Sequence, residues 1–213
     1  MSPLLVAGLV LLGLAATLGY FRGVRKNRAI AASIAGGLEE ALRPVATEYV
    51  NVGGSIGHNF TFRLAGDLTE ARGVFTLSPR HSLLYLPLSR LLGIRDRLFL
   101  NVFTSRLLRG EGHVVRSSDL RRAGIAGIEA MERREVRANG FPFVLLWRGA
   151  DLSGPLEEVL RGMPDPARLR HFCAYPGTGT FFLRTEPVPD SVAEDVSAAL
   201  RGASAFLAAT RDR

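Results

Sequence analysis

The residues that could do chemistry begin with a short glycine-rich stretch around Ser55. Gly53-Gly54-Ser55-Ile56-Gly57 matches the G-x-S-x-G pattern letter for letter. A nucleophile elbow of that pattern needs a strand, a sharp turn and then a helix, so that the serine is exposed. Here the following residues, 58–64, alternate as a strand does. A plain loop explains the pattern, and a hydrolase using Ser55 is the weaker alternative.

The histidines and the cysteine give no stronger signal. Only His171 and Cys173 are close in sequence, and their i, i+2 spacing places both on one face of a strand. Two ligands do not make a zinc site, so a packed cysteine beside an ordinary histidine is the simpler interpretation. The sequence has no Walker loop, dinucleotide fingerprint or EF-hand. We therefore expect a protein that is not an enzyme, with no catalytic residues, no metal site and no cofactor.

The first twenty residues point to a membrane instead. The span from Pro3 to Phe21 carries no charge, and its 19 residues would form a helix of about 28 Å, close to the thickness of a bilayer core. A cleaved signal peptide would need a positive region before the span, and a soluble core helix would be less uniformly apolar. We predict a single transmembrane anchor over residues 1–28. Its basic flank consists of Arg22, Arg25, Lys26 and Arg28.

The basic flank also predicts an orientation. Positive residues favour the cytoplasmic side, which places the N-terminus outside the cell membrane and residues 29–213 in the cytoplasm. A single cysteine, Cys173, fits a reducing compartment. The remaining stretch, about 185 residues, is the size of one domain with its own hydrophobic core.

Periodicity within this domain predicts an α+β fold, a largely antiparallel sheet with packed helices. An amphipathic helix is expected over Asn27–Glu48, ended or bent by Pro44. A leucine-rich helix should start at Ser78-Pro79, and Asp119 should cap a helix that runs to about Arg137. The other expected elements are strands over 60–64, 73–77, 97–104 and 141–147, a helix over 153–162, a hairpin over 169–175 and 180–185, and a last helix after a capping box at Ser191 and Glu194.

The charge of the domain suggests one more surface. The formal net charge is +7, and Lys26 is the only lysine, so nearly all basic residues are arginine. This bias can reflect nucleotide composition and a solvated surface, or attraction to anionic headgroups or RNA. The leucine-rich segment 80–92 and its neighbouring arginines are our predicted partner surface. Those arginines are Arg80, Arg90, Arg95 and Arg97.

The order of these segments resembles the cytosolic domain of the calumin-like family, the coiled-coil-domain subunit of the endoplasmic-reticulum PAT complex. The resemblance covers about residues 20–210 and fits a compact prokaryotic or archaeal relative. It is carried, after the anchor and its basic flank, by Gly53-Gly54, the hairpin segments 64–68 and 72–77, the basic leucine-rich segment 80–92, and the segments 95–102, 168–172 and 180–183.

The resemblance implies a non-enzymatic accessory role in membrane-protein biogenesis, with contacts to the ribosome, the translocon and a small membrane partner, and no DNA partner. We expect no calcium binding, because no acidic segment precedes the anchor, and ribosome contact through a basic coiled-coil tail is not expected because the sequence ends at Arg213. The alternative is a tethered domain that binds a lipid or small ligand in an apolar cavity between sheet and helices.

Overall fold

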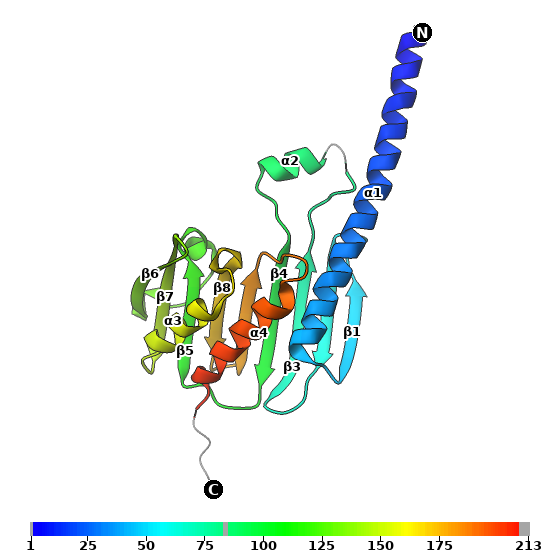
Figure 1. Ribbon diagram of the computed structural model, residues 1–213. Coiled ribbons are helices and arrows are strands. Elements are labelled where there is room, and N and C mark those ends of the chain that lie inside the picture. Colours follow the sequence, from blue (N-terminus) through cyan, green and yellow to red (C-terminus); the bar gives the residue numbers. More distant parts are fainter. Residues whose placement is uncertain (1, 83–84, 209–213) are drawn as a thin grey trace.

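A computed structural model describes residues 2–82 and 85–208, and it has an antiparallel sheet with helices packed on one face and a long helix projecting from it (Figure 1). The predicted α+β class is confirmed. The helices are α1 (Pro3–Leu42), α2 (Tyr85–Leu91), α3 (Ser153–Gly162) and α4 (Val192–Ala203). The strands are β1 (Ala46–Asn51), β2 (Gly57–Arg63), β3 (Leu68–Thr76), β4 (Arg97–Thr104), β5 (Gly110–Arg116), β6 (Glu132–Ala138), β7 (Phe141–Gly149), β8 (Leu169–Tyr175) and β9 (Thr180–Thr185).

The sheet has nine strands in the order β1-β2-β3-β4-β9-β8-β5-β7-β6, and every neighbouring pair is antiparallel. The hairpin predicted over 169–175 and 180–185 is confirmed as β8 and β9. This C-terminal hairpin is inserted between β4 and β5, which follow each other in sequence. The central position of the hairpin decides which side chains meet across the sheet.

One face of the sheet packs against the second half of α1 and against α3 and α4 (Figure 1). Alternate residues of β4, among them Leu98 and Leu100, are buried there because successive side chains of a strand point to opposite faces. From α1, Ile34 and Leu38 are completely buried in the same layer. The core of the domain therefore lies between the sheet and these three helices.

The opposite face carries a cover of irregular structure where a helix was predicted. The helix predicted from Asp119 to about Arg137 is wrong: two short 3-10 helices, η1 (Ser117–Arg122) and η2 (Ile128–Ala130), precede strand β6. Gly124 and Gly127 both have positive φ, a left-handed conformation that interrupts a right-handed helix. This segment packs over one end of the sheet, with side chains that include Leu120, Ile125, Ile128 and Met131 against Val144 and Leu146 of β7.

Helix α1 joins the apolar span to the domain without a break. It runs for 40 residues, about 60 Å, and ends where Arg43 adopts a left-handed conformation just before Pro44. Among the described residues it is the one helix long and apolar enough to cross a membrane, and its apolar half is not buried. The boundary expected after residue 28 falls inside α1, because Gly23 and Asn27 are already buried against the domain.

Helix α2 projects from the domain toward the same side as the N-terminal half of α1 (Figure 1). The helix expected from Ser78-Pro79 begins only at Tyr85, and residues 83–84 before it lie outside the described part of the chain. The segment leading to α2 touches α1 at Gly23, where a Cβ would overlap the backbone of Arg80 and His81. The His81 ring also meets the Tyr20 ring edge-on, with centroids 5.7 Å apart.

The close approach at Gly23 gives a stability prediction. Gly23→Ala should destabilise the protein by about 1–3 kcal/mol, because the added methyl group has no space between two backbones. Gly36→Ala is the matched control on the same helix: nothing lies near its Cβ position, so the higher helix propensity of alanine should stabilise by about 0.5–1 kcal/mol. Thermal unfolding of full-length protein in mild detergent, followed by Trp147 fluorescence, measures both. Equal shifts of the two variants would contradict the packing of segment 78–81 on α1.

Candidate functional site

The predicted anchor flank lies on an accessible stretch of α1. Arg22, Arg25, Lys26 and Arg28 are all exposed. They follow directly after the apolar half of the helix and surround the buried positions Gly23 and Asn27. The flank is therefore free to meet anionic groups at the level where the domain begins.

Of the predicted partner surface, Arg80 has a structural role. Its guanidinium donates to both carboxylate oxygens of Asp96, at 3.0 and 2.7 Å, and to Asn27 Oδ1 at 3.1 Å. The completely buried Asn27 in turn donates from Nδ2 to the carbonyl of Ser78 at 3.0 Å. These hydrogen bonds hold the segment before α2 against α1. They also direct the Arg80 guanidinium toward partners within the protein.

The other arginines of that surface differ from Arg80. Arg95 is 67% exposed and lies 3.4 Å from Glu186, and Arg97 is also exposed. The side chain of Arg90 lies outside the described part of the structure. Glu186 also pairs with Arg170 at 2.6 Å. Because two arginines share this one carboxylate, Glu186 neutralises the charge of Arg95 only in part.

Helix α2 adds an apolar surface next to the basic one. Its exposed side chains are Tyr85 (46%), Leu88 (47%) and Leu91 (84%), followed by Leu92 (64%). These four residues belong to the leucine-rich segment 80–92 of the predicted partner surface, and their side chains are exposed. The segment projects away from the sheet, where the domain offers no layer to cover it.

Ser55 lies in the turn between β1 and β2, and another strand follows it. The turn is held by Asn51, which donates from Nδ2 to the carbonyl of Gly54 at 2.7 Å and accepts from the Gly53 amide at 3.1 Å. The nearby His58 ring stacks on Phe75. The strand–turn–helix geometry that a Ser55 nucleophile requires is therefore absent from this segment.

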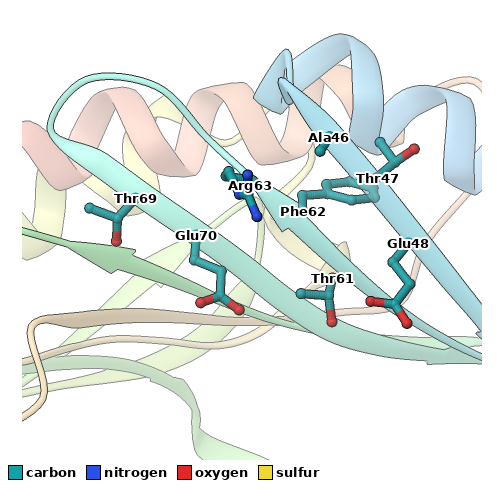
Figure 2. A pocket seen from close by; sticks show the side chains of 8 residues that line it. All are labelled: Ala46, Thr47, Glu48, Thr61, Phe62, Arg63, Thr69 and Glu70. Carbon is teal, nitrogen blue, oxygen red and sulfur yellow. The ribbon is translucent and has the colours of Figure 1, made fainter.

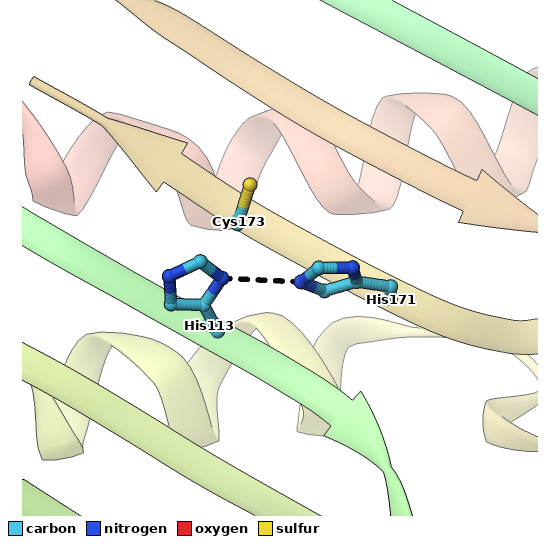
Figure 3. A group of neighbouring side chains, drawn as sticks. All are labelled: His113, His171 and Cys173. Atoms are coloured by element: carbon cyan, nitrogen blue, oxygen red, sulfur yellow. Dashed lines mark hydrogen bonds between the residues drawn. The ribbon is translucent and has the colours of Figure 1, made fainter. Parts of the chain in front are cut away.

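The sequence interpretation missed a buried polar cluster on the second face of the sheet (Figure 3). His113 of β5 lies directly opposite Cys173 of β8, and His171 follows on the same face of β8. His113 Nδ1 is 3.1 Å from His171 Nε2, and one ligand atom from each of the three residues lies within 4.8 Å of the others. The pair His171 and Cys173 was visible in sequence, but the third residue is 58 positions away.

A buried carboxylate contacts the second ring nitrogen of His113, the one that does not face His171. Glu111 Oε1 lies 3.0 Å from His113 Nε2, and its Oε2 accepts from Arg148 Nε at 2.6 Å. Glu111 is 5% exposed, so its charge is balanced inside the protein by Arg148 rather than by water. Because a carboxylate accepts a hydrogen bond from the Nε2–H group, His113 is expected to direct the lone pair of Nδ1 at His171.

Burial controls the protonation of all three groups. It lowers the pKa of His171 to about 3, with smaller contributions from His113 and Arg184. Desolvation also lowers the pKa of His113, although Glu111 opposes this shift, and it raises the pKa of the Cys173 thiol. At neutral pH both imidazoles are therefore uncharged and the thiol keeps its proton.

The cluster borders an open groove on the second face of the sheet, with a volume of about 600 Å³. His171 and Cys173 form part of its lining. The groove is otherwise bounded by aromatic and polar side chains of the central strands and by the irregular cover, among them Phe99, Asn101, Phe103, Arg122, Tyr175, Phe182 and Arg184. A small molecule in this groove would reach the cluster without crossing the core.

A second depression, of about 510 Å³, lies over the outer strands β1, β2 and β3 (Figure 2). Glu48, Thr61 and Glu70 extend their polar groups to one side of the sheet there. Glu70 is held by an ion pair with Arg72 of the same strand. This depression contains none of the three residues of the buried cluster, and we assign it no role.

The depressed pKa of His171 predicts acid sensitivity. Below about pH 6.5 the unfolded chain binds a proton at His171 that the folded chain excludes until about pH 3, so the free energy of unfolding falls as pH decreases through this window. Compared with His171→Gln, the wild type should lose up to about 1.4 kcal/mol more per pH unit between pH 6 and 4. Urea unfolding of the full-length protein in detergent and chelator measures this difference. Parallel pH profiles of the two proteins would contradict it.

Comparison with known proteins adds no further assignment. The resemblance to the calumin-like family consequently stays a prediction from the order of short segments. No family model and no curated protein matches this chain.

Proposed function

We propose that this chain is a membrane-anchored, non-enzymatic accessory protein that assists the biogenesis of other membrane proteins. The observation that carries the proposal is the position of α2 beside the anchor. An exposed apolar helix and an exposed apolar span start from one rigid junction on the domain. Surfaces of this kind meet lipid or apolar protein segments, because large exposed apolar patches mark interaction sites.

The junction supports the geometry of this proposal. Gly23 against Arg80, the ring contact of Tyr20 with His81, and the buried Asn27 fix the base of α2 where the apolar span ends. Under the proposal, α2 therefore lies at the membrane–water interface. Its seven residues are too few to cross a bilayer, so it would lie within the interface.

The charges around the junction favour the same placement. The four basic residues of the anchor flank are exposed and follow the apolar span directly. Arg95 and Arg97 add exposed positive charge near the base of α2. In the proposed orientation these residues face the cytoplasmic leaflet and the ribosome, whose anionic groups they would attract.

An apolar transmembrane segment of a client protein is the occupant that fits this arrangement. The anchor exposes the large side chains of its apolar half, and α2 exposes Leu88 and Leu91 on the same side of the domain. A client helix emerging beside the anchor would have both surfaces available, with basic residues next to its cytoplasmic end. The proposal accordingly assigns α2 to contacts with client segments at the interface.

A second candidate function is binding of a lipid or small ligand by the tethered domain. Most of the layer between sheet and helices, where the cavity was expected, is filled by buried side chains such as Leu100, Phe172 and Val196. An open depression of about 640 Å³ lies at the edge of this layer, between β6 and α3. The observation that favours this candidate is the groove of about 600 Å³ on the opposite face. A groove of this size would accommodate a small molecule.

Photo-crosslinking in native membranes tests the proposal. A photoreactive amino acid at Leu91 should form adducts with apolar transmembrane peptides of newly made membrane proteins, because Leu91 is 84% exposed on α2. Leu107 provides the control: it is 80% exposed in the loop that follows the far end of β4 and should give no such adducts. Adducts with lipid alone, or equal adducts from both sites, would contradict client binding by α2.

Charge reversal tests the basic part of the proposal. Arg95→Glu combined with Arg97→Glu should reduce co-sedimentation with ribosomes several-fold and weaken its salt sensitivity, since phosphate contacts are lost. Arg133→Glu combined with Arg137→Glu on the edge strand β6 is the matched control, because these arginines are also exposed but belong to the other end of the sheet. Wild-type co-sedimentation of the Arg95/Arg97 variant would refute the ribosome contact.

A further inference from the structure

We propose that His113, His171 and Cys173 form a zinc-binding site whose fourth coordination position opens into the groove on the second face of the sheet. The sequence analysis predicted no metal site here, because only two of the three ligands, His171 and Cys173, are close together in the sequence. The inference is independent of the proposed biogenesis role. It rests on four features of the cluster: ligand spacing, ligand type, ligand orientation and access.

The ligand atoms have nearly the spacing that a metal requires. Tetrahedral zinc, with Zn–N of about 2.0–2.1 Å and Zn–S of about 2.3 Å, holds two nitrogens about 3.3 Å apart and a nitrogen and a sulfur about 3.6 Å apart. The two facing nitrogens are 3.1 Å apart, and the sulfur lies within 4.8 Å of both. A shift of the thiol by about 1 Å completes the three-ligand arrangement.

The ligand set favours zinc over the common oxygen-binding cations. Two imidazoles and a thiolate are borderline-soft ligands that suit Zn²⁺, whereas Mg²⁺ and Ca²⁺ prefer oxygen ligands. The ligands are carried by two neighbouring strands within the sheet rather than by loops. The positions of their Cα atoms are therefore fixed before a metal arrives.

Glu111 orients the first imidazole for this role. By accepting a hydrogen bond from the Nε2–H group of His113, it leaves the Nδ1 lone pair facing His171. Arg148 holds the other oxygen of Glu111, so the carboxylate cannot easily rotate away. A carboxylate behind a histidine in this way is the usual support of a histidine that binds a metal.

Protonation and access are also compatible with metal binding. Since His113 directs its Nδ1 lone pair at His171, Nε2 of His171 carries the proton of their hydrogen bond. On metal binding this proton is lost from Nε2 while Nδ1 of His171 takes one up, so that both facing nitrogens offer a lone pair to the ion. Zn²⁺ binding forms the Zn–S bond and breaks the Cys173 S–H bond, and the proton leaves to solvent. His171 and Cys173 line the groove, which gives the ion a path inward and leaves the fourth position to water or a small anionic ligand.

Cobalt substitution of the full-length protein in detergent is the deciding experiment. After chelator treatment, one equivalent of Co²⁺ should produce the intense visible bands of a tetrahedral site and a thiolate-to-cobalt charge-transfer band. One equivalent of Zn²⁺ should then abolish both. The charge-transfer band should disappear in Cys173→Ser and persist in the control His58→Gln, whose ring lies on Phe75 outside the cluster.

A substitution that removes no ligand keeps the proposal falsifiable where a ligand variant fails to fold. Glu111→Gln should weaken zinc affinity about 10–100-fold, measured by competition with a chromophoric chelator, because the support of His113 is altered. Wild-type protein without a charge-transfer band, or with zinc binding unchanged in Glu111→Gln and Cys173→Ser, would overturn the site.

Discussion

The packing of the second half of α1 on the sheet is the constraint on which the rest of the structure depends. Ile34 and Leu38 belong to the hydrophobic core, while the first half of the same helix exposes its apolar side chains. Since the helix has no break between the two halves, the domain and the apolar span share one rigid axis. The segment before α2 is then fixed to that axis through Gly23 and Asn27. The orientation of the sheet relative to the apolar span is therefore set inside the core.

The two faces of the sheet have different roles because they are covered differently. Helices seal one face mainly with apolar side chains, and the buried Asp195 of α4 is paired with Arg168 there. On the other face, the irregular segment around η1 and η2 covers only one end, and polar residues such as His171 and Asn101 remain beside a groove. Burying a polar residue costs little only when it has hydrogen-bond partners. Consecutive hydrogen bonds linking Arg148, Glu111, His113 and His171 provide these partners. The chemistry of the domain is consequently concentrated on the less covered face.

Much of the fold followed from local patterns. The β8–β9 hairpin, α3 and the end of α1 before Pro44 were predicted because alternation, helical spacing and proline act over a few residues. The segment after Asp119 was wrong because two glycines with positive φ override an otherwise helical composition. The cluster was only half visible, since His113 reaches His171 through strand order, which no local pattern encodes. The ion pair of Arg80 was not predicted for a similar reason: its partner Asp96 follows α2 in the chain, 16 residues later.

The insertion of β8 and β9 between β4 and β5 also dictates an order of assembly. While the chain is being synthesised, β1–β4 can pair with one another and so can β5–β7, but in the described sheet these two groups of strands are joined only through β8 and β9, residues 169–185. The β8–β9 hairpin joins the two groups of strands at the centre of the sheet, and α4, which follows it in the chain, packs over the core. A ribosome that stalled before this hairpin would hold an anchored chain with two half-sheets and unpaired inner edges. The domain therefore becomes a single cooperative unit only after residues 169–185 have been synthesised.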